Sequence, residues 1–255
     1  MQKEQVVYSR PQTLREQQFS YCPGCGHSTV HKLIAEIVEE LGIRENMVGV
    51  SPVGCAVFGY NFWNFDVTEA AHGRTPVVAT AIKRVLPDRV VFSYQGDGDL
   101  ASIGLAEILH TANRGENITV IFINNTNYGM TGGQLAPTTL INQVTTTSPA
   151  GRDIRNYGYP IKVAELLSPL EGVKYLERVK VTNAASIIKT RKAIKKAFLY
   201  QINQIGFSLV EVLTSCPANW HKDEKQSIKW VEEVVAGYYP IGIIKDINKE
   251  GGEND

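Results

Sequence analysis

Residues 89–125, RVVFSYQGDGDLASIGLAEILHTANRGENITVIFINN, decide the fold of this 255-residue chain. Residues 89–94 are β-branched and aromatic, and they predict a strand that runs into the turn QGDGD. Residues 100–115 then predict a helix, and residues 118–125 form a continuous apolar run typical of a strand buried on both faces. Strand, helix and strand within about 35 residues form a βαβ unit, so we expect the two strands to be parallel.

Similar patterns flank this unit. Residues 28–41 place apolar side chains at helical spacing, with Gly42 as a stop. Near the end of the chain, residues 173–181, 184–202 and 207–213 again predict strand, helix and strand. Together these patterns indicate an α/β fold with a doubly wound, mostly parallel sheet.

A long polar segment, residues 131–160, separates the two units and lacks periodicity. Loops of this length in a compact domain are usually functional or mobile. No linker or internal repeat divides the chain, so we expect one domain over residues 1–255.

Composition limits the partners and the compartment. The chain has 26 basic and 26 acidic residues, and this balance gives no reason to expect a nucleic acid as partner. The start, residues 1–18, is polar, and no apolar run reaches the roughly 18 residues of a membrane span. We therefore expect a cytoplasmic protein without a membrane partner. Disulfides are unusual in the cytoplasm, so the four cysteines of this chain are better explained as metal ligands or redox groups.

Polar side chains follow the two strands of the first unit. Asp97 comes just after one strand, and Asn125 closes the next. Because the carboxyl ends of parallel strands share one edge of a sheet, we expect both side chains to meet there. Carboxylate and amide oxygens suit Mg²⁺, which takes its other ligands from phosphate and water. Flanking glycines let backbone amides approach those phosphates, so the pattern predicts a metal-chelated pyrophosphate.

Taken singly, GDGD is typical of a tight turn and NN of a strand end. A dinucleotide-binding alternative fits poorly, because G-x-G-x-x-G is absent from the first βα turn. The joint pattern resembles the thiamine diphosphate signature, in which the Asp, the last Asn and a backbone carbonyl two residues on ligate magnesium. This resemblance implies Asp97, Asn125 and the carbonyl of Asn127 as the ligands.

The cysteines form one C-x₂-C pair, Cys22 and Cys25, and two isolated residues, Cys55 and Cys216. A structural zinc site would normally draw its other ligands from a second close pair, and a thioredoxin-like dithiol would leave two cysteines unused. Unrelated buried cysteines are a further alternative. All four lie among glycine and proline residues, which expose backbone amides near sulfur, as an iron-sulfur cluster requires. Cys216 also follows the last predicted strand, at the edge expected for Asp97.

The whole chain resembles the β subunit of 2-oxoacid:ferredoxin oxidoreductases, of the type that includes 2-oxoglutarate and 2-oxoisovalerate enzymes. Six ordered motifs within residues 21–220 carry the resemblance: YCPGCGH, SPVGCAVF, AAHGR, YQGDGDLASIG, NNTNYGMTGGQLAPTT and SCPANW. It implies a thiamine diphosphate-binding fold in which Cys22, Cys25, Cys55 and Cys216 hold one 4Fe-4S cluster. The cluster-binding N-terminal segment would span about residues 19–55, and a C-terminal extension about residues 217–255.

The resemblance also implies further cofactor contacts, and His72 is a candidate polar contact with a structural role as its alternative. The thiamine ring would lie against Val53, Gly54, Cys55 and Ala56. Gly98 and Asp99 would hold the pyrophosphate, and Gly129, Met130 and Thr131 would form the loop after the magnesium ligands.

The expected reaction converts a 2-oxoacid, coenzyme A and oxidised ferredoxin to acyl-coenzyme A, carbon dioxide and reduced ferredoxin. Thiamine enzymes need a carboxylic acid against the aminopyrimidine, and the resemblance puts that glutamate on a separate α subunit. No catalytic acid is therefore assigned to this chain, which we expect to be active only in a hetero-oligomer. A γ domain or subunit and a ferredoxin-like δ subunit are further expected partners.

Substrate choice rests on the stretch CAVFGYNFWNF, residues 55–65, which is apolar and aromatic. No positive charge occurs there to hold the distal carboxylate of 2-oxoglutarate, so the stretch favours 2-oxoisovalerate or another branched-chain oxoacid. The alternatives are 2-oxoglutarate as substrate, a thiamine-dependent decarboxylase subunit without redox chemistry, and a non-enzymatic subunit stabilised by zinc.

Overall fold

The computed structural model describes residues 8–248, so residues 1–7 of the polar start and 249–255 of the expected C-terminal extension lie outside the described residues. Within them the chain folds around one seven-stranded sheet in the order β2-β1-β3-β4-β6-β5-β7. Neighbouring strands are parallel except β7, which runs antiparallel to β5. The expected mostly parallel α/β sheet is confirmed. The strands are β1 (Met47–Ser51), β2 (Asp66–Glu69), β3 (Val90–Gly96), β4 (Thr119–Asn124), β5 (Val173–Lys180), β6 (Phe207–Leu213) and β7 (Gly242–Asp246).

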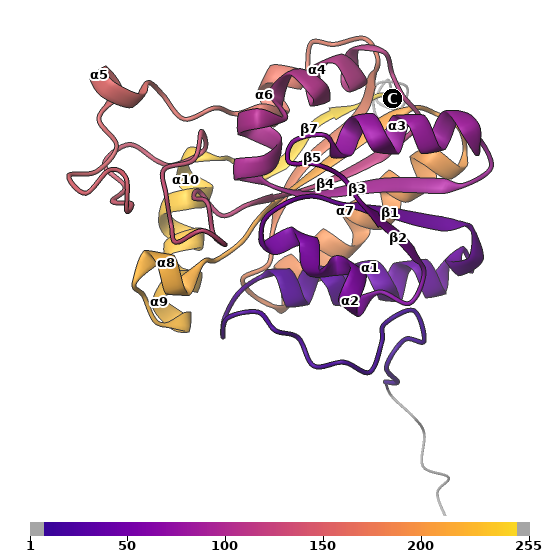
Figure 1. The fold of residues 1–255 in the computed structure, drawn as a ribbon, viewed down its shortest axis with the longest axis horizontal. Helices are drawn as coiled ribbons and strands as arrows, with labels where there is room; N and C mark the ends of the chain where they lie inside the picture. The colour runs from indigo at the N-terminus through magenta and orange to yellow at the C-terminus, as the bar shows by residue number, and fades with distance from the viewer. Residues whose placement is uncertain (1–7, 249–255) are drawn as a thin grey trace, which may run out of the picture.

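Helices cover both faces of the sheet (Figure 1), with α1 and α7 on one face and α3, α4 and α6 on the other. Each layer buries its own apolar cluster against the central strands. No helix of the described residues is both long and apolar enough to cross a membrane. The α-helices are α1 (His27–Glu40), α2 (Gly59–Phe62), α3 (Thr75–Val85), α4 (Leu105–Asn113), α5 (Ile154–Tyr157), α6 (Val163–Leu167), α7 (Ala184–Ile202), α8 (Pro217–Trp220), α9 (Glu224–Trp230) and α10 (Ala236–Tyr238).

The helix expected at residues 100–115 differs from the structure at its start. Asp99–Ile103 forms a π-helical turn, and α4 begins only after Gly104. A Cβ atom at Gly104 would lie 2.7 Å from the Asp99 carbonyl oxygen and 2.8 Å from that of Gly73. Gly104 thus lets the loop before α3 approach the turn, and this contact shapes the surroundings of Asp99.

The long polar segment is irregular, as expected, and it projects with α5 from one side of the sheet (Figure 1). Its order comes from Arg152, which is 3% exposed. The guanidinium donates to the carbonyl oxygens of Ala136, Pro137, Thr139, Tyr157, Gly158 and Tyr159. One buried side chain therefore replaces the hydrogen bonds that a helix or strand would supply.

Four central strands end at the same edge of the sheet. Asp97 follows β3 directly and Asn125 follows β4 directly. Cys55 lies in the 3-10 turn after β1, and Cys216 follows β6. Because β1, β3, β4 and β6 are parallel, these four residues are carried to one place by the fold.

Candidate functional site

Oxygen atoms of Asp97, Asn125 and Asn127 converge just beyond the carboxyl ends of β3 and β4. The position of Asn125 Oδ1 lies 2.7 Å from the Asn127 carbonyl oxygen, 3.0 Å from Asn127 Oδ1 and 3.2 Å from Asp97 Oδ1. All three residues are buried. Oxygens this close together need either a cation between them or a rotation of the Asn125 amide that turns its nitrogen toward them. The structure brings together the three residues that the resemblance implied as magnesium ligands.

Neutral groups surround the Asp97 carboxylate. Its Oδ1 accepts from Gly98 N at 2.9 Å, and its Oδ2 accepts from Thr138 Oγ1 at 2.6 Å. Burial raises the pKa of Asp97 to about 7, although these hydrogen bonds act in the opposite direction. A cation bound here would favour the ionised form instead.

A turn centred on Thr126 aims Asn125 and Asn127 at the same point. Thr126 has a φ of 60°, which is uncommon for a residue other than glycine. Its N–H donates to Asn124 Oδ1 at 3.2 Å, and its carbonyl oxygen accepts from Thr139 Oγ1 at 2.6 Å. These bonds hold the left-handed conformation, so the residues on either side both face Asp97.

The Asp99 carboxylate is occupied by donors from the protein. Oδ1 accepts from His72 Nδ1 at 2.5 Å and from Gly73 N at 2.8 Å, and Oδ2 accepts from Gln95 Nε2 at 2.6 Å. The side chain is 1% exposed, whereas that of His72 is 35% exposed. Asp99 therefore fixes the His72 ring by one nitrogen and leaves the imidazole as the accessible member of the pair.

A cavity of 140 Å³ adjoins the converging oxygens. Val53 and Met130 contribute exposed apolar side chains to it, at 46% and 43%. All the cofactor contacts implied by the resemblance line this cavity, namely Val53, Gly54, Cys55, Ala56, His72, Gly98, Asp99, Gly129, Met130 and Thr131. The sequence motifs that are far apart in the chain thus form one continuous wall.

A second cavity, of 360 Å³, is lined by all four cysteines, Cys22, Cys25, Cys55 and Cys216. Cys25, Cys55 and Cys216 are partly buried, whereas Cys22 is exposed. Burial raises the pKa of Cys25 to about 12 and that of Cys55 to about 11. In residues 8–248, no three His, Cys, Asp or Glu side chains are grouped closely enough to hold a single metal ion. The four cysteines instead line one shared cavity, so a group that they held together would have to be larger than a single metal ion.

Asn219 connects the cysteines to the loop that follows the magnesium candidates. Its Nδ2 donates to Cys216 Sγ at 3.3 Å and to the Gly129 carbonyl oxygen at 2.8 Å. A Cβ atom at Gly129 would lie 3.2 Å from Cys55 Sγ and 3.8 Å from Cys216 Sγ. Only glycine fits at Gly129 without a tight contact to sulfur, so the two cavities meet at this residue.

Five residues line both cavities, and they are His27, Cys55, Asn125, Gly129 and Met130. His27 is fully enclosed, its Nδ1 lies 2.7 Å from the Tyr94 hydroxyl, and burial lowers its pKa to about 4. The ring is therefore neutral at pH 7 and belongs to the aromatic packing behind the wall.

Sequence reasoning missed Thr138 and Asn219, which contact Asp97 and Cys216. Thr138 is 41 positions from Asp97, so no local spacing connects them. Thr138 lies in the motif that ends QLAPTT, and Asn219 lies in SCPANW. Membership of these motifs was the only sign in the sequence that the two residues belong to the site.

Comparison with known proteins identifies the family of this chain. Residues 52–212 match the family model described as "Thiamine pyrophosphate enzyme, C-terminal TPP binding domain". The ketoisovalerate oxidoreductase subunit VorA of Methanothermobacter thermautotrophicus is 48% identical over 230 residues, covering 90% of this chain and 48% of VorA. The chain thus spans about half the length of that relative.

Two shorter relatives are matched over most of their length. The 2-oxoglutarate synthase subunit KorB of Methanocaldococcus jannaschii is 35% identical, covering 84% of this chain and 77% of KorB. Subunit beta of 2-oxoacid:ferredoxin oxidoreductase 2 of Aeropyrum pernix is 33% identical, with coverages of 87% and 69%. A solved structure of 2-oxoglutarate:ferredoxin oxidoreductase from Magnetococcus marinus superposes with a TM-score of 0.74 at 27% identity, covering 84% of this chain and 70% of that one. The chain therefore belongs to the thiamine pyrophosphate-binding β subunits of the 2-oxoacid:ferredoxin oxidoreductase family.

Proposed function

We propose that this chain binds thiamine diphosphate through one Mg²⁺ and carries one 4Fe-4S cluster in an enzyme that converts a 2-oxoacid to acyl-coenzyme A and carbon dioxide. Electrons from the oxidation would pass through the cluster to ferredoxin. One observation carries the proposal: the cavity beside the converging oxygens and the cavity lined by four cysteines share Cys55 and Gly129. A redox cluster beside an organic cofactor is the arrangement that this chemistry needs.

The oxygen geometry supports magnesium. Mg²⁺ binds oxygen at about 2.0–2.1 Å in an octahedron, which places neighbouring ligand oxygens about 2.9 Å apart. The distances from the Asn125 Oδ1 position to oxygens of Asn127 and Asp97 are 2.7 to 3.2 Å. The buried Asp97 carboxylate supplies the negative charge. We therefore assign Asp97 Oδ1, Asn125 Oδ1 and the Asn127 carbonyl oxygen as ligands, with diphosphate and water completing the shell.

The remaining wall suits a diphosphate and a thiazolium ring. Thiamine diphosphate supplies the nucleophilic carbon and the electron sink that decarboxylation of a 2-oxoacid requires. Gly98 lines this cavity, and its lack of a Cβ atom makes room for the Tyr128 ring, while His72, held by Asp99, would offer the diphosphate a hydrogen bond. Val53 and Met130 are placed to contact the apolar part of the cofactor. The Asp99 carboxylate is engaged by three protein donors, so its contribution to the diphosphate would come from the backbone.

The cysteine cavity suits a cluster better than one zinc ion. Its volume of 360 Å³ is far larger than the roughly 10–15 Å³ of cavity that a single water needs. Asn219 donates to Cys216 Sγ, and hydrogen bonds to sulfur are what a cluster of thiolate and sulfide needs to spread its charge. We assign Cys22, Cys25, Cys55 and Cys216 as the four ligands.

We propose 2-oxoisovalerate or another branched-chain 2-oxoacid as the substrate. Val53 and Met130 bring exposed apolar side chains to the cavity beside the proposed metal ligands, which suits an aliphatic substituent. The name of VorA, a ketoisovalerate oxidoreductase subunit, agrees with this choice. 2-Oxoglutarate is the second candidate, because KorB and the solved structure from Magnetococcus marinus are named for it.

Other polypeptides complete the proposed enzyme. An α subunit would supply the glutamate that activates thiamine diphosphate, a γ domain or subunit would complete the assembly, and electrons would pass to ferredoxin in the cytoplasm. The solved relative contains coenzyme A, which supports that part of the reaction.

The test is a substrate comparison with the complex purified without oxygen. With 2-oxoisovalerate, coenzyme A, thiamine diphosphate and Mg²⁺, we expect ferredoxin reduction with kcat/KM at least about tenfold above that for 2-oxoglutarate, a difference of about 1.4 kcal/mol. A reversed preference would establish 2-oxoglutarate as the substrate. Carbon dioxide release without any electron transfer would refute the redox function and favour a simple decarboxylase.

A further inference from the structure

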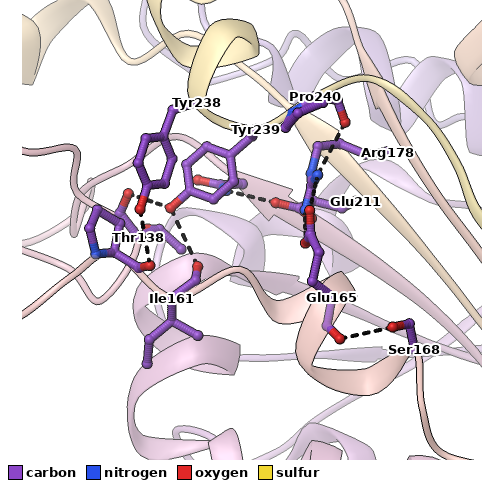
Figure 2. Close-up of polar contacts among 11 residues, drawn as sticks. Thr138, Ile161, Glu165, Ser168, Arg178, Glu211, Tyr238, Tyr239 and Pro240 are labelled. Atoms are coloured by element: carbon purple, nitrogen blue, oxygen red, sulfur yellow. Dashed lines mark hydrogen bonds and ion pairs between the residues drawn. The ribbon is translucent and has the colours of Figure 1, made fainter.

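Arg178, Glu211 and Glu165 form an ion network in which only Glu165 is partly exposed (Figure 2). Arg178 of β5 is opposite Glu211 of β6 in the strand register, and both side chains are 0% exposed. Arg178 Nε donates to Glu211 Oε2 at 2.8 Å. The other end of the guanidinium donates to both oxygens of Glu165, at 2.8 and 2.5 Å, and to the Pro240 carbonyl oxygen at 3.1 Å. One cation is therefore held between two carboxylates.

The first arm of this network reaches the turn at Thr126. Glu211 Oε1 accepts from Asn124 Nδ2 at 2.8 Å, and Asn124 Oδ1 accepts from Thr126 N at 3.2 Å. A carboxylate can only accept, so Glu211 determines which end of the Asn124 amide faces it and which end faces Thr126. Thr126 has its uncommon φ of 60° between two of the proposed metal ligands. The orientation of Asn124 therefore helps to fix Thr126, and through Thr126 it affects Asn125 and Asn127 on either side.

A second arm runs from Arg178 through Tyr239 to Thr138 (Figure 2), and Thr138 contacts Asp97. The Tyr239 ring lies 5.4 Å from Arg178 Cζ, in the range of a cation–π contact. Its hydroxyl donates to the Thr138 carbonyl oxygen at 2.8 Å, and Thr138 Oγ1 donates to Asp97 Oδ2 at 2.6 Å. Arg178 is therefore connected to both strands that carry the proposed ligands.

We propose that Arg178 and its two arms, Glu211–Asn124 and Tyr239–Thr138, position the oxygens that bind Mg²⁺, and this inference rests on the proposed function. A buried ion pair is weak support for stability, because desolvation offsets much of its attraction. The geometry points to a positioning role instead, because each side-chain oxygen or nitrogen of Glu211 and Asn124 has one hydrogen-bond partner that fixes its orientation. Arg178 and the members of its two arms are positioning residues, because their contacts reach the proposed metal ligands only through Thr126 and Thr138.

Glu211→Gln tests this with little change in shape. Glutamine has only one oxygen, so it cannot accept from both Arg178 Nε and Asn124 Nδ2. The glutamine oxygen is expected to keep the hydrogen bond from Arg178 Nε, because that bond is charge-assisted. Asn124 then turns its amide to accept from the new nitrogen, and Thr126 N–H loses its acceptor. The expected result is a weaker metal site in a chain that still folds.

The measurement is Mn²⁺ affinity in the intact complex at saturating thiamine diphosphate, read from the electron paramagnetic resonance signal of free Mn²⁺. We expect Glu211→Gln to weaken Mn²⁺ binding by about tenfold or more, as is typical for residues behind metal ligands. Glu116→Gln is the matched control. Glu116 is also buried and contacts Arg84 and Arg114, but it lies at the amino end of β4. Its Mn²⁺ affinity is expected to stay within about twofold of the wild type.

Equal Mn²⁺ affinity in Glu211→Gln and wild type, or an equal loss in Glu116→Gln, would overturn the inference. If Glu211→Gln does not fold, Tyr239→Phe decides, because it keeps the ring over Arg178 and removes only the hydroxyl. A threefold or greater loss of Mn²⁺ affinity in Tyr239→Phe would support the network, and unchanged affinity would refute it. A wild-type complex that binds no Mn²⁺ with thiamine diphosphate would overturn the proposed function and this inference with it.

Discussion

Asp97→Asn should stabilise the metal-free chain and abolish its cation site. The asparagine oxygen can keep the hydrogen bond from Gly98 N, and its nitrogen can donate to the Thr138 hydroxyl, so shape and hydrogen bonds are retained. The change removes one negative charge that is buried among neutral groups. The same charge is what the proposed Mg²⁺ needs.

The size of the effect follows from the pKa of Asp97, which burial raises from 3.8 to about 7. The folded state then holds a proton that the unfolded state has released, so this group's contribution to stability is greatest below pH 3.8 and falls as the pH rises to about 7. Each pKa unit corresponds to about 1.4 kcal/mol, which makes the full loss roughly 4 kcal/mol. Between pH 5 and pH 8 the wild type loses roughly 2–3 kcal/mol of its free energy of unfolding through this group. Asp97→Asn has no ionisable group at this position and does not show this loss.

The assay is urea unfolding of the full chain in the presence of a chelator at pH 5 and pH 8. The stability advantage of Asp97→Asn over wild type should grow by roughly 2–3 kcal/mol between these pH values. Asp88→Asn, at an exposed position, is the control and should show no such change. With Mg²⁺ and thiamine diphosphate the order should reverse, because only the wild type gains from binding. A pH-independent difference between Asp97→Asn and wild type would refute the reasoning from burial.

Three other substitutions test separate parts of the site. Asn219→Leu removes the N–H donated to Cys216 Sγ, so the midpoint potential of the cluster should become more negative in a redox titration, and an unchanged potential would contradict the assigned hydrogen bond. His72→Gln should weaken thiamine diphosphate binding by about 10- to 100-fold in calorimetry, the equivalent of one charge-assisted hydrogen bond, while His110→Gln on exposed α4 surface should not. Gly98→Ala would place a Cβ atom 2.4 Å from the Tyr128 ring, so unfolding should show a loss of about 1–3 kcal/mol; equal stability would mean that the ring moves freely.

The sequence predicted the centre of the fold well because its signals there are local. β4 is a continuous buried apolar run, and the basic helix expected around residues 184–202 is α7, which the structure starts at a capping box formed by Asn183 and Ser186. Asp97 and Asn125 could be predicted to meet because two strand ends in one βαβ unit must share an edge, whereas Asn127 came only from the resemblance to the thiamine diphosphate signature. These are properties of short stretches and of parallel strand geometry.

Other features depend on contacts that no short stretch contains. β1 and β2 are only five and four residues long, so strand propensity alone was too weak to predict them. β1 also contains Gly49, where a Cβ atom would lie 3.2 Å from the Phe92 ring. The π-helical turn at Asp99 depends on the approach of Gly73. Arg178 and Glu211 looked like ordinary strand residues, because their pairing is visible only across β5 and β6.

The most direct test of the account is the content of iron, zinc and acid-labile sulfide in the chain purified without oxygen, together with its thiamine diphosphate. We predict about four irons and four sulfides per chain on Cys22, Cys25, Cys55 and Cys216, and no zinc. Replacing Cys216 by serine should lower both iron and sulfide. One zinc per chain with no sulfide, in protein never exposed to air, would contradict the account and give the cysteines a structural role.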